Sequence, residues 1–154
     1  MAEDRPPWHV VCVDGDVQRP LAVSALDLSR FPQREVVAVR AGTALRWQGV
    51  DVRWLLTVSG SEPRARFAIF HSGDRHICLP LEQVSKENAL LALRAEGRWL
   101  AAEEGGPCRL VLQGSRWRDF GGPVDRIQVC VDRPVTVATH LYGSDSPRAT
   151  AGAA

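Results

Sequence analysis

The chain has 154 residues, the usual size of one domain, and 45% of them are apolar, as in an ordinary globular protein. Its formal net charge of +1 gives no overall attraction to nucleic acid or to an anionic membrane surface. No run approaches the roughly 18 consecutive apolar residues of a transmembrane helix, so we expect neither a membrane span nor a nucleic-acid partner.

The two ends of the chain differ in composition from its middle. The N-terminus, MAEDRPPWHV, has acidic residues and prolines where a secretory signal needs a basic and then an apolar segment. We therefore expect a cytoplasmic protein with a flexible arm over residues 1–8, one domain over 9–143 and a disordered tail over 144–154. Lys86 is the only lysine beside many arginines, which is typical of a GC-rich, bacterial genome rather than of a function.

The first part of the chain predicts short strands around one small helix. Apolar runs over 9–13 and 21–23 are typical of strands, and turn residues follow the first. Ser24 and Asp27 have the spacing of a capping box, so a helix is predicted over Ala25–Arg30, before Pro32. The β-branched residues at 36, 37 and 39 predict a further strand, followed by a short loop before Trp47.

A second helix is predicted over Val52–Ser59. Trp54, Leu55 and Val58 share one face of it, Asp51 can cap its N-terminus, and Gly60 stands just past its end. Later strands are predicted over 66–71, 76–79, 109–113 and 126–132.

The segment 86–104 allows two interpretations. Its Ala, Leu, Glu and Arg content favours one amphipathic helix interrupted at Gly97. The dipeptide Glu96-Gly97 equally predicts a turn between strands over 90–94 and 98–100.

Seven to nine short strands and two or three short helices, joined mostly by tight turns, predict an α+β fold. Its sheets should be mixed or antiparallel and β-rich, because the pattern lacks the regular crossover helices of a doubly wound parallel sheet.

Five motifs in order along the chain carry a resemblance to a known family. They are PLAVSALDLSRFP, RWQGVDVRWLL, FAIFHSGDRHICLPLEQV, LLALRAEGRWLAAEEGGPCRLVLQG and the closing DRIQV. In this order and spacing the chain resembles the molybdopterin-binding domain of the sulfite oxidase family. The resemblance implies that family's β-rich fold, favours the hairpin over the helix at 86–104, and implies a pterin cofactor that performs two-electron oxygen-atom chemistry on molybdenum.

The sequence departs from the family at two places. The cysteine that adds a thiolate to molybdenum should lie at or beside Ala41, and no cysteine occurs between Cys12 and Cys78. The loop that grips the pterin phosphate in the family contains lysines, whereas Asp119 and Gly122 stand here. A carboxylate repels phosphate, so Arg116 and Arg118 are the candidates for that role, and the alternative is that both are solvated surface side chains.

The expected cofactor-binding residues are therefore Arg40, His71, Arg116 and Arg118, with no catalytic residue and no metal ligand assigned. His71 and His76 are better explained by a reverse turn than by a metal site, and the four cysteines by burial as small apolar groups. Trp47 and Trp54 are expected to pack in the core.

Two functions remain open from the sequence. One is a divergent molybdopterin-binding oxidoreductase-like domain without standard molybdenum catalysis. The alternative is a non-catalytic binding or interaction module on the sulfite oxidase fold, and the partner expected for this chain is either the pterin cofactor or another protein.

Overall fold

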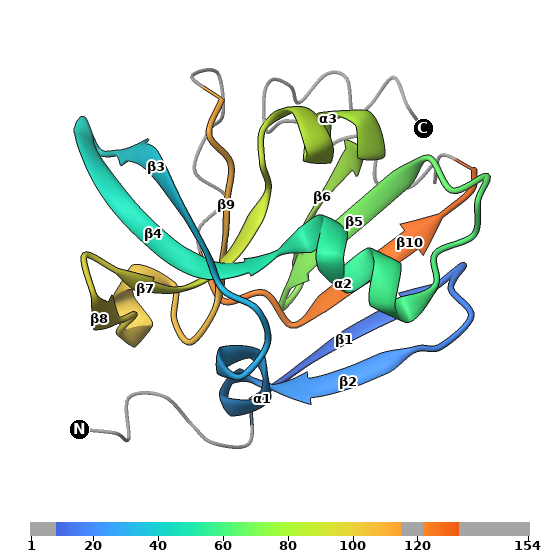
Figure 1. Cartoon of the computed structure of the whole chain (residues 1–154), viewed down its shortest axis with the longest axis horizontal. Coiled ribbons are helices and arrows are strands. Elements are labelled where there is room, and N and C mark those ends of the chain that lie inside the picture. The colour runs from blue at the N-terminus through green and yellow to red at the C-terminus, as the bar shows by residue number, and fades with distance from the viewer. Residues whose placement is uncertain (1–8, 115–121, 133–154) are drawn as a thin grey trace.

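A computed structural model describes residues 9–114 and 122–132 of the chain. These residues form two five-stranded sheets with short helices beside them, so the predicted β-rich α+β fold is confirmed (Figure 1). The strands are β1 Val10–Gly15, β2 Leu21–Ser24, β3 Arg34–Arg40, β4 Thr43–Asp51, β5 Phe67–Ser72, β6 Arg75–Pro80, β7 Leu90–Ala95, β8 Arg98–Trp99, β9 Arg109–Val111 and β10 Arg126–Cys130. The helices are α1 Ala25–Ser29, α2 Val52–Ser59 and α3 Leu81–Lys86, and the 3₁₀ turn η2 spans Ala102–Glu104.

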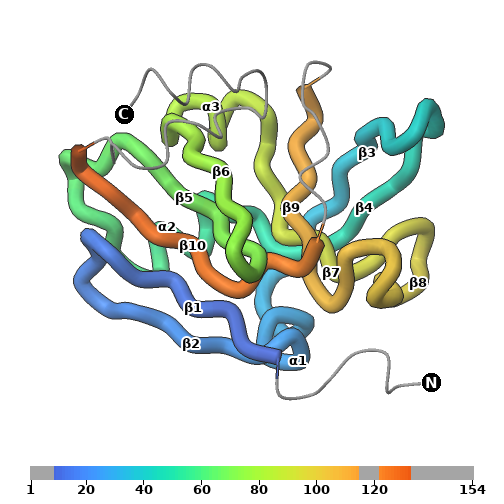
Figure 2. Tube along the Cα trace, turned by 180° about the vertical axis from the view of Figure 1, so that it is seen from behind, coloured from blue at the N-terminus to red at the C-terminus, as the bar shows by residue number. Residues whose placement is uncertain are grey.

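The first sheet has the strand order β2-β1-β10-β5-β6. Only the β1–β10 pair is parallel, so this sheet is mixed. Successive residues of a strand face opposite sides, and here Val11, Val13, Ile127 and Val129 face the main core. The strands β10, β5 and β6 lie together at the front of the view from behind in Figure 2.

The second sheet has the order β3-β4-β7-β8, and β9 pairs with the other end of β7. Both faces of its strand β7 are buried, because Leu91 and Leu93 join the main core while Leu90 and Ala92 join a smaller core around Trp47. The sheet lies beside the first one in Figure 1, with β3 and β9 at its two margins. This arrangement leaves one edge of β3 and one edge of β9 without a neighbouring strand among the described residues.

The caps predicted for the two helices are confirmed. Ser24 and Asp27 exchange hydrogen bonds at the start of α1, and the Asp51 carboxylate accepts from the Arg53 amide at the start of α2. Gly60 ends α2 with a φ of 71°, a conformation that glycine adopts without strain. The last helix, α3, was not placed by the sequence pattern, because its six residues are too few to show a clear period.

The hairpin interpretation of 86–104 is confirmed and the helix interpretation is wrong. Glu96 and Gly97 both have positive φ and form the turn between β7 and β8. Tertiary pairing of β7 with β4 and β9 outweighs the helix propensity of its residues. The short loop expected before Trp47 is a two-residue turn, and β4, which the sequence analysis did not place, begins directly after it.

The predicted arm and tail over 1–8 and 144–154 lie outside the described residues. No helix of the described part is long and apolar enough to cross a membrane.

Candidate functional site

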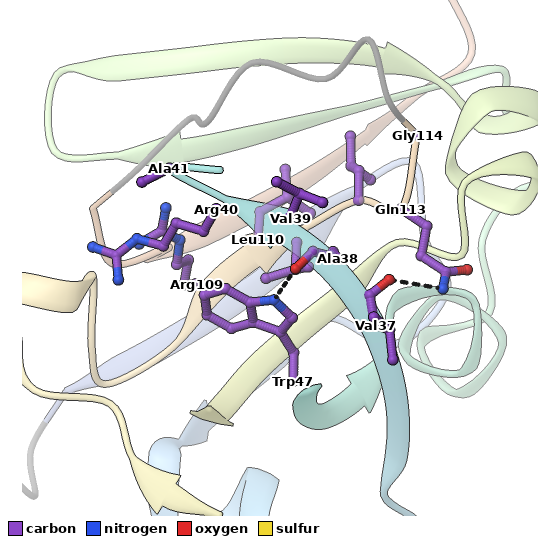
Figure 3. Close-up of a pocket in the computed structure, with 12 residues that line it drawn as sticks. Val37, Ala38, Val39, Arg40, Ala41, Trp47, Arg109, Leu110, Gln113 and Gly114 are labelled. Carbon is purple, nitrogen blue, oxygen red and sulfur yellow. Dashed lines mark hydrogen bonds between the residues drawn. The ribbon is translucent and has the colours of Figure 1, made fainter. Parts of the chain in front are cut away.

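The candidate site lies where β3 and β9 face each other. A pocket of about 340 Å³ separates them, and Figure 3 shows it with its lining side chains. Its described lining consists of two nearly continuous runs of chain plus one core side chain: Val37, Ala38, Val39, Arg40, Ala41, Arg109, Leu110, Val111, Leu112, Gln113, Gly114 and Trp47. Because consecutive residues line the pocket, over 37–41 and over 109–114, it is bounded by backbone at the strand edges as well as by side chains.

The β3–β4 hairpin turn forms one end of the pocket. Arg40 pairs with Thr43 across the turn, and the two residues between them, Ala41 and Gly42, have φ values of 50° and 82°. Two successive residues in the left-handed conformation define a type I′ turn. The backbone twist of this turn matches the twist of the two strands that it connects. Ala41 is therefore an exposed turn residue at the pocket mouth.

Trp47 supports the pocket from the smaller core. Its indole is 2% exposed, and its Nε1 donates to the Ala38 carbonyl at 3.1 Å. The predicted core role of this tryptophan is confirmed, as is that of Trp54, which lies against Phe31 with a ring-centroid separation of 5.0 Å.

Arg109 places a positive charge inside the pocket wall. This side chain is 4% exposed, its guanidinium lies 5.5 Å from the Trp47 ring centroid, and it donates to the Glu104 carbonyl at 2.6 Å. Arg40 is half-buried at the same end of the pocket, beside Ala41, as Figure 3 shows. These two guanidinium groups make that end of the described lining positively charged.

Gln113 closes the opposite end of the pocket. Its side-chain amide donates to the Val37 carbonyl at 3.1 Å, a bond drawn in Figure 3, and its Oε1 accepts from Asn88 at 2.6 Å. Asn88 in turn accepts from Arg34 at 3.0 Å. This chain of bonds fixes the separation of the two strand edges at that end.

Asp51 anchors the same network at the start of α2. Arg34 and Arg53 donate to its carboxylate at 2.6 and 2.9 Å. Partial burial raises the pKa of Asp51, but hydrogen bonds from Arg53 and Arg34 and the Arg53 charge outweigh it, and the net pKa is lowered. The carboxylate is thus held ionised where it caps α2 and orients Arg34.

The structure brings only one expected cofactor residue to this pocket. Arg40 lines it, whereas His71 lies on β5 in the other sheet, where its Nε2 is 3.1 Å from Gln128 Oε1. Arg116 and Arg118, with Asp119, lie outside the described residues. Arg109 and Gln113 were not predicted from the sequence as site residues. The signal that could have identified Arg109 is its position as the first residue of the strand after Gly105-Gly106-Pro107.

The two neighbouring histidines face each other across a hairpin. His71 pairs directly with His76, and their ring centroids are 5.8 Å apart. The reverse turn predicted between them is confirmed, at Gly73 with a φ of 63°. No group of three or more His, Cys, Asp or Glu side chains in the described part of the chain could hold a metal ion.

The cysteines lie away from the pocket. Cys78 and Cys108 are buried, as predicted, while Cys12 and Cys130 are only half-buried. Burial raises the pKa of the Cys108 thiol to about 12, and the thiol donates to the Val124 carbonyl at 3.4 Å. It is therefore a neutral group near neutral pH and a poor metal ligand.

Comparison with known proteins shows to which family this chain belongs. Residues 2–129 match the family described as the oxidoreductase molybdopterin binding domain. This chain belongs to that family. Among solved structures it is similar to the sulfane dehydrogenase SoxCD from Paracoccus pantotrophus, with a TM-score of 0.71 and 23% identity over 82% of this chain. The match covers 39% of the SoxCD chain. No curated protein matches the chain described here.

The residues of this molybdopterin binding domain can be tested against the cofactor of its family. A metal held by the dithiolene sulfur atoms of the pterin prefers soft donor atoms. A cysteine thiolate is the soft donor that a residue at the end of a strand can add. The described lining of the pocket has no thiol, imidazole or carboxylate, so it does not fit a protein-ligated metal. Arg40 and Arg109 do fit the anionic part of an organic ligand.

Proposed function

We propose that this molybdopterin binding domain is a non-catalytic binding module, which holds an anionic ligand between β3 and β9 and performs no thiolate-ligated molybdenum chemistry. The observation that carries the proposal is the composition of the pocket lining, where two arginines accompany apolar residues and no described side chain can ligate a metal.

The position of Ala41 supports the same proposal. A thiolate ligand has to point into the site from a rigid element, and a second group has to orient it. Ala41 is an exposed residue of a two-residue turn, and its methyl group offers neither charge nor lone pair. The hairpin is too tight to hold a longer ligand-bearing loop between Arg40 and Thr43.

A second candidate is an organic pterin held without a bond from the protein to the metal. Arg40 and Arg109 favour it, because guanidinium groups bind phosphate in a bidentate manner. Arg116 and Arg118 are proposed to add to this grip. The two candidates differ in what fills the pocket of the purified protein.

The test is to purify the chain from a host that makes the molybdenum cofactor. The protein is then assayed for fluorescent oxidised pterin and for sulfite-dependent reduction of ferricyanide. The binding-module proposal predicts a folded protein with neither signal. Pterin without turnover would favour the second candidate, and turnover that follows the bound pterin would overturn the proposal.

A further inference from the structure

The face of the first sheet that points away from the main core carries a smaller group of buried side chains. Ile69 on β5 and Cys78 on β6 pair directly with each other and are 2% and 1% exposed. The residues on either side of them along the two strands belong to the main core: Ala68, Phe70, Ile77 and Leu79. Because successive residues of a strand face opposite sides, Ile69 and Cys78 lie on the outer face. Together with the half-buried Phe67 and Cys130 they form the outer cluster.

The burial of the outer cluster requires a layer above it. Cys78 lies on β6, the last strand of the described sheet, so the neighbouring strand β5 flanks it on one side. Flanking side chains of the same sheet do not lie over such a residue, and an apolar sheet face is shielded from water when another element packs against it. The exposed fractions are those of a single chain, so the covering layer belongs to this chain and not to a partner.

The helices and the second sheet lie against the inner face of the first sheet. Leu55 of α2, Val84 of α3 and Leu91 of β7 all pack in the main core. Within residues 9–114 and 122–132, the outer cluster consists of residues from the strands of the first sheet itself. The layer above the cluster therefore comes from another part of the chain, which is 1–8, 115–121 or 133–154.

The points at which these segments join the described chain favour the C-terminal one. Residues 1–8 lead to His9, whose Nε2 is 3.1 Å from the Val124 carbonyl, just before β10 begins. Residues 115–121 lead to Gly122, where a Cβ would lie 2.6 Å from the Ser72 Oγ, at the turn between β5 and β6. Both points lie at one end of the sheet. At the other end β10 finishes with Cys130, a member of the outer cluster, and residues 133–154 follow it.

The sequence that follows β10 suits a covering layer. Residues 133–143 read RPVTVATHLYG, in which Val135, Val137 and Leu141 stand at alternate positions with Thr139 between them. Such alternation of β-branched and apolar residues is typical of an extended segment with one buried face. Eleven extended residues reach up to about 36 Å, several times the roughly 5 Å between neighbouring strands. The residues after Gly143, SDSPRATAGAA, are small and polar and lack such a face.

We propose that residues 134–142 pack over the outer cluster, with Val135, Val137 and Leu141 facing Ile69 and Cys78. The segment lies beyond residues 2–129, which match the family, and it carries the folded domain on to about residue 143. The first sheet is then buried on both faces, and its outer face is closed to a partner protein. This inference does not depend on what the pocket between β3 and β9 binds.

The first experiment is hydrogen exchange, followed by mass spectrometry, on the full wild-type chain. We expect the amides of residues 134–142 to exchange at least about tenfold more slowly than their unstructured rates, because docking on the sheet restricts their opening. The amides of residues 145–154 should exchange at the unstructured rates and serve as the reference within the same chain. Exchange of 134–142 at unstructured rates would overturn the inference.

The second experiment measures alkylation of Cys78 by N-ethylmaleimide relative to that of Cys108, which is buried in the main core and reports unfolding of the whole chain. Replacing Val135 and Val137 together by aspartate should raise the ratio of the Cys78 rate to the Cys108 rate about tenfold, because charge on the covering face opposes docking.

The matched control replaces Thr136 and Ala138, on the alternate face of the same segment, by aspartate and should leave the ratio unchanged. If the first pair of substitutions unfolds the chain, Val137→Ser takes its place and the same ratio decides. An equal ratio in the two faces' variants would overturn the inference and would leave the proposed function standing.

Discussion

Gly49 is the residue at which β4 comes closest to β7. A Cβ built on it would lie 2.1 Å from the Leu91 carbonyl oxygen, a backbone atom that cannot move aside. The pairing register between the strands also shifts at Gln48 and Gly49. Glycine here lets the second sheet bend, and that bend helps to position β3 relative to β9.

We expect Gly49→Ala to lower the free energy of unfolding by about 3 kcal/mol, because the methyl group forces the two strands apart. Gly73→Ala is the control, since its Cβ would meet nothing within 4 Å and only the φ of 63° adds strain. The control should lose about 1 kcal/mol. Urea unfolding measures both, and equal losses would refute the close-approach account.

Asp51 gives a second prediction at this scale, which depends on pH. Its folded pKa is below the ordinary 3.8, so its stabilisation is complete above that pH and is lost as the pH falls through the folded pKa. Asp51→Asn should therefore lower the free energy of unfolding by about 2 kcal/mol at pH 7. The difference from the wild type should shrink as the pH falls below 3.8.

The control for Asp51 is Glu62→Gln, which removes an exposed carboxylate 3.8 Å from Arg64. Its loss should stay below about 0.5 kcal/mol at every pH. A deficit of Asp51→Asn that is the same at pH 3 and pH 7 would show that the ion pairs with Arg34 and Arg53 contribute nothing.

At the scale of elements, the β3–β4 hairpin depends on its two-residue turn. Ala41 adopts a positive φ of 50°, which costs an alanine more than it costs asparagine or glycine. Ala41→Asn should raise the free energy of unfolding by about 0.5–1 kcal/mol. Ala44→Asn, in an exposed extended position of β4, is the control and should be destabilising. A lower melting temperature for Ala41→Asn than for the wild type would contradict the turn assignment.

Local signals were sufficient to predict some elements and not others. The caps at Ser24 and Asp51 depend on side chains next to the helix they cap, so their spacing alone identified both helices. Residues 90–95 were ambiguous, because a strand buried on both faces has no alternation to distinguish it from a helix. The pairing of β7 with β4 and β9 decides that case, and it involves residues far apart in the sequence.

At the scale of the whole molecule, the site was only partly predictable. Arg40 could be predicted as a residue of the site because it is next to Ala41, the position at which the resemblance to the family implies a metal ligand. Arg109 lies in β9 and Gln113 lies two residues beyond its end, and β9 is connected to β3 only through the fold, by way of β7 and β4. His71 is not among the described lining residues of this pocket, and it pairs with His76 across a hairpin of the other sheet.

The whole molecule combines the fold of its family with a pocket of different chemistry. The chain keeps the architecture of the molybdopterin binding domain, yet the described lining of its pocket carries arginines and strand edges in place of metal donors. Catalysis on such a scaffold is a property of the site and not of the fold.

The most direct test is the molybdenum content of the folded chain, purified from a cofactor-producing host and measured by mass spectrometry, together with that of its four single Cys→Ala variants. Our account predicts far less than one molybdenum per chain in the wild type, with no change in any variant. About one molybdenum per chain in the wild type, lost when one particular cysteine is replaced, would contradict it.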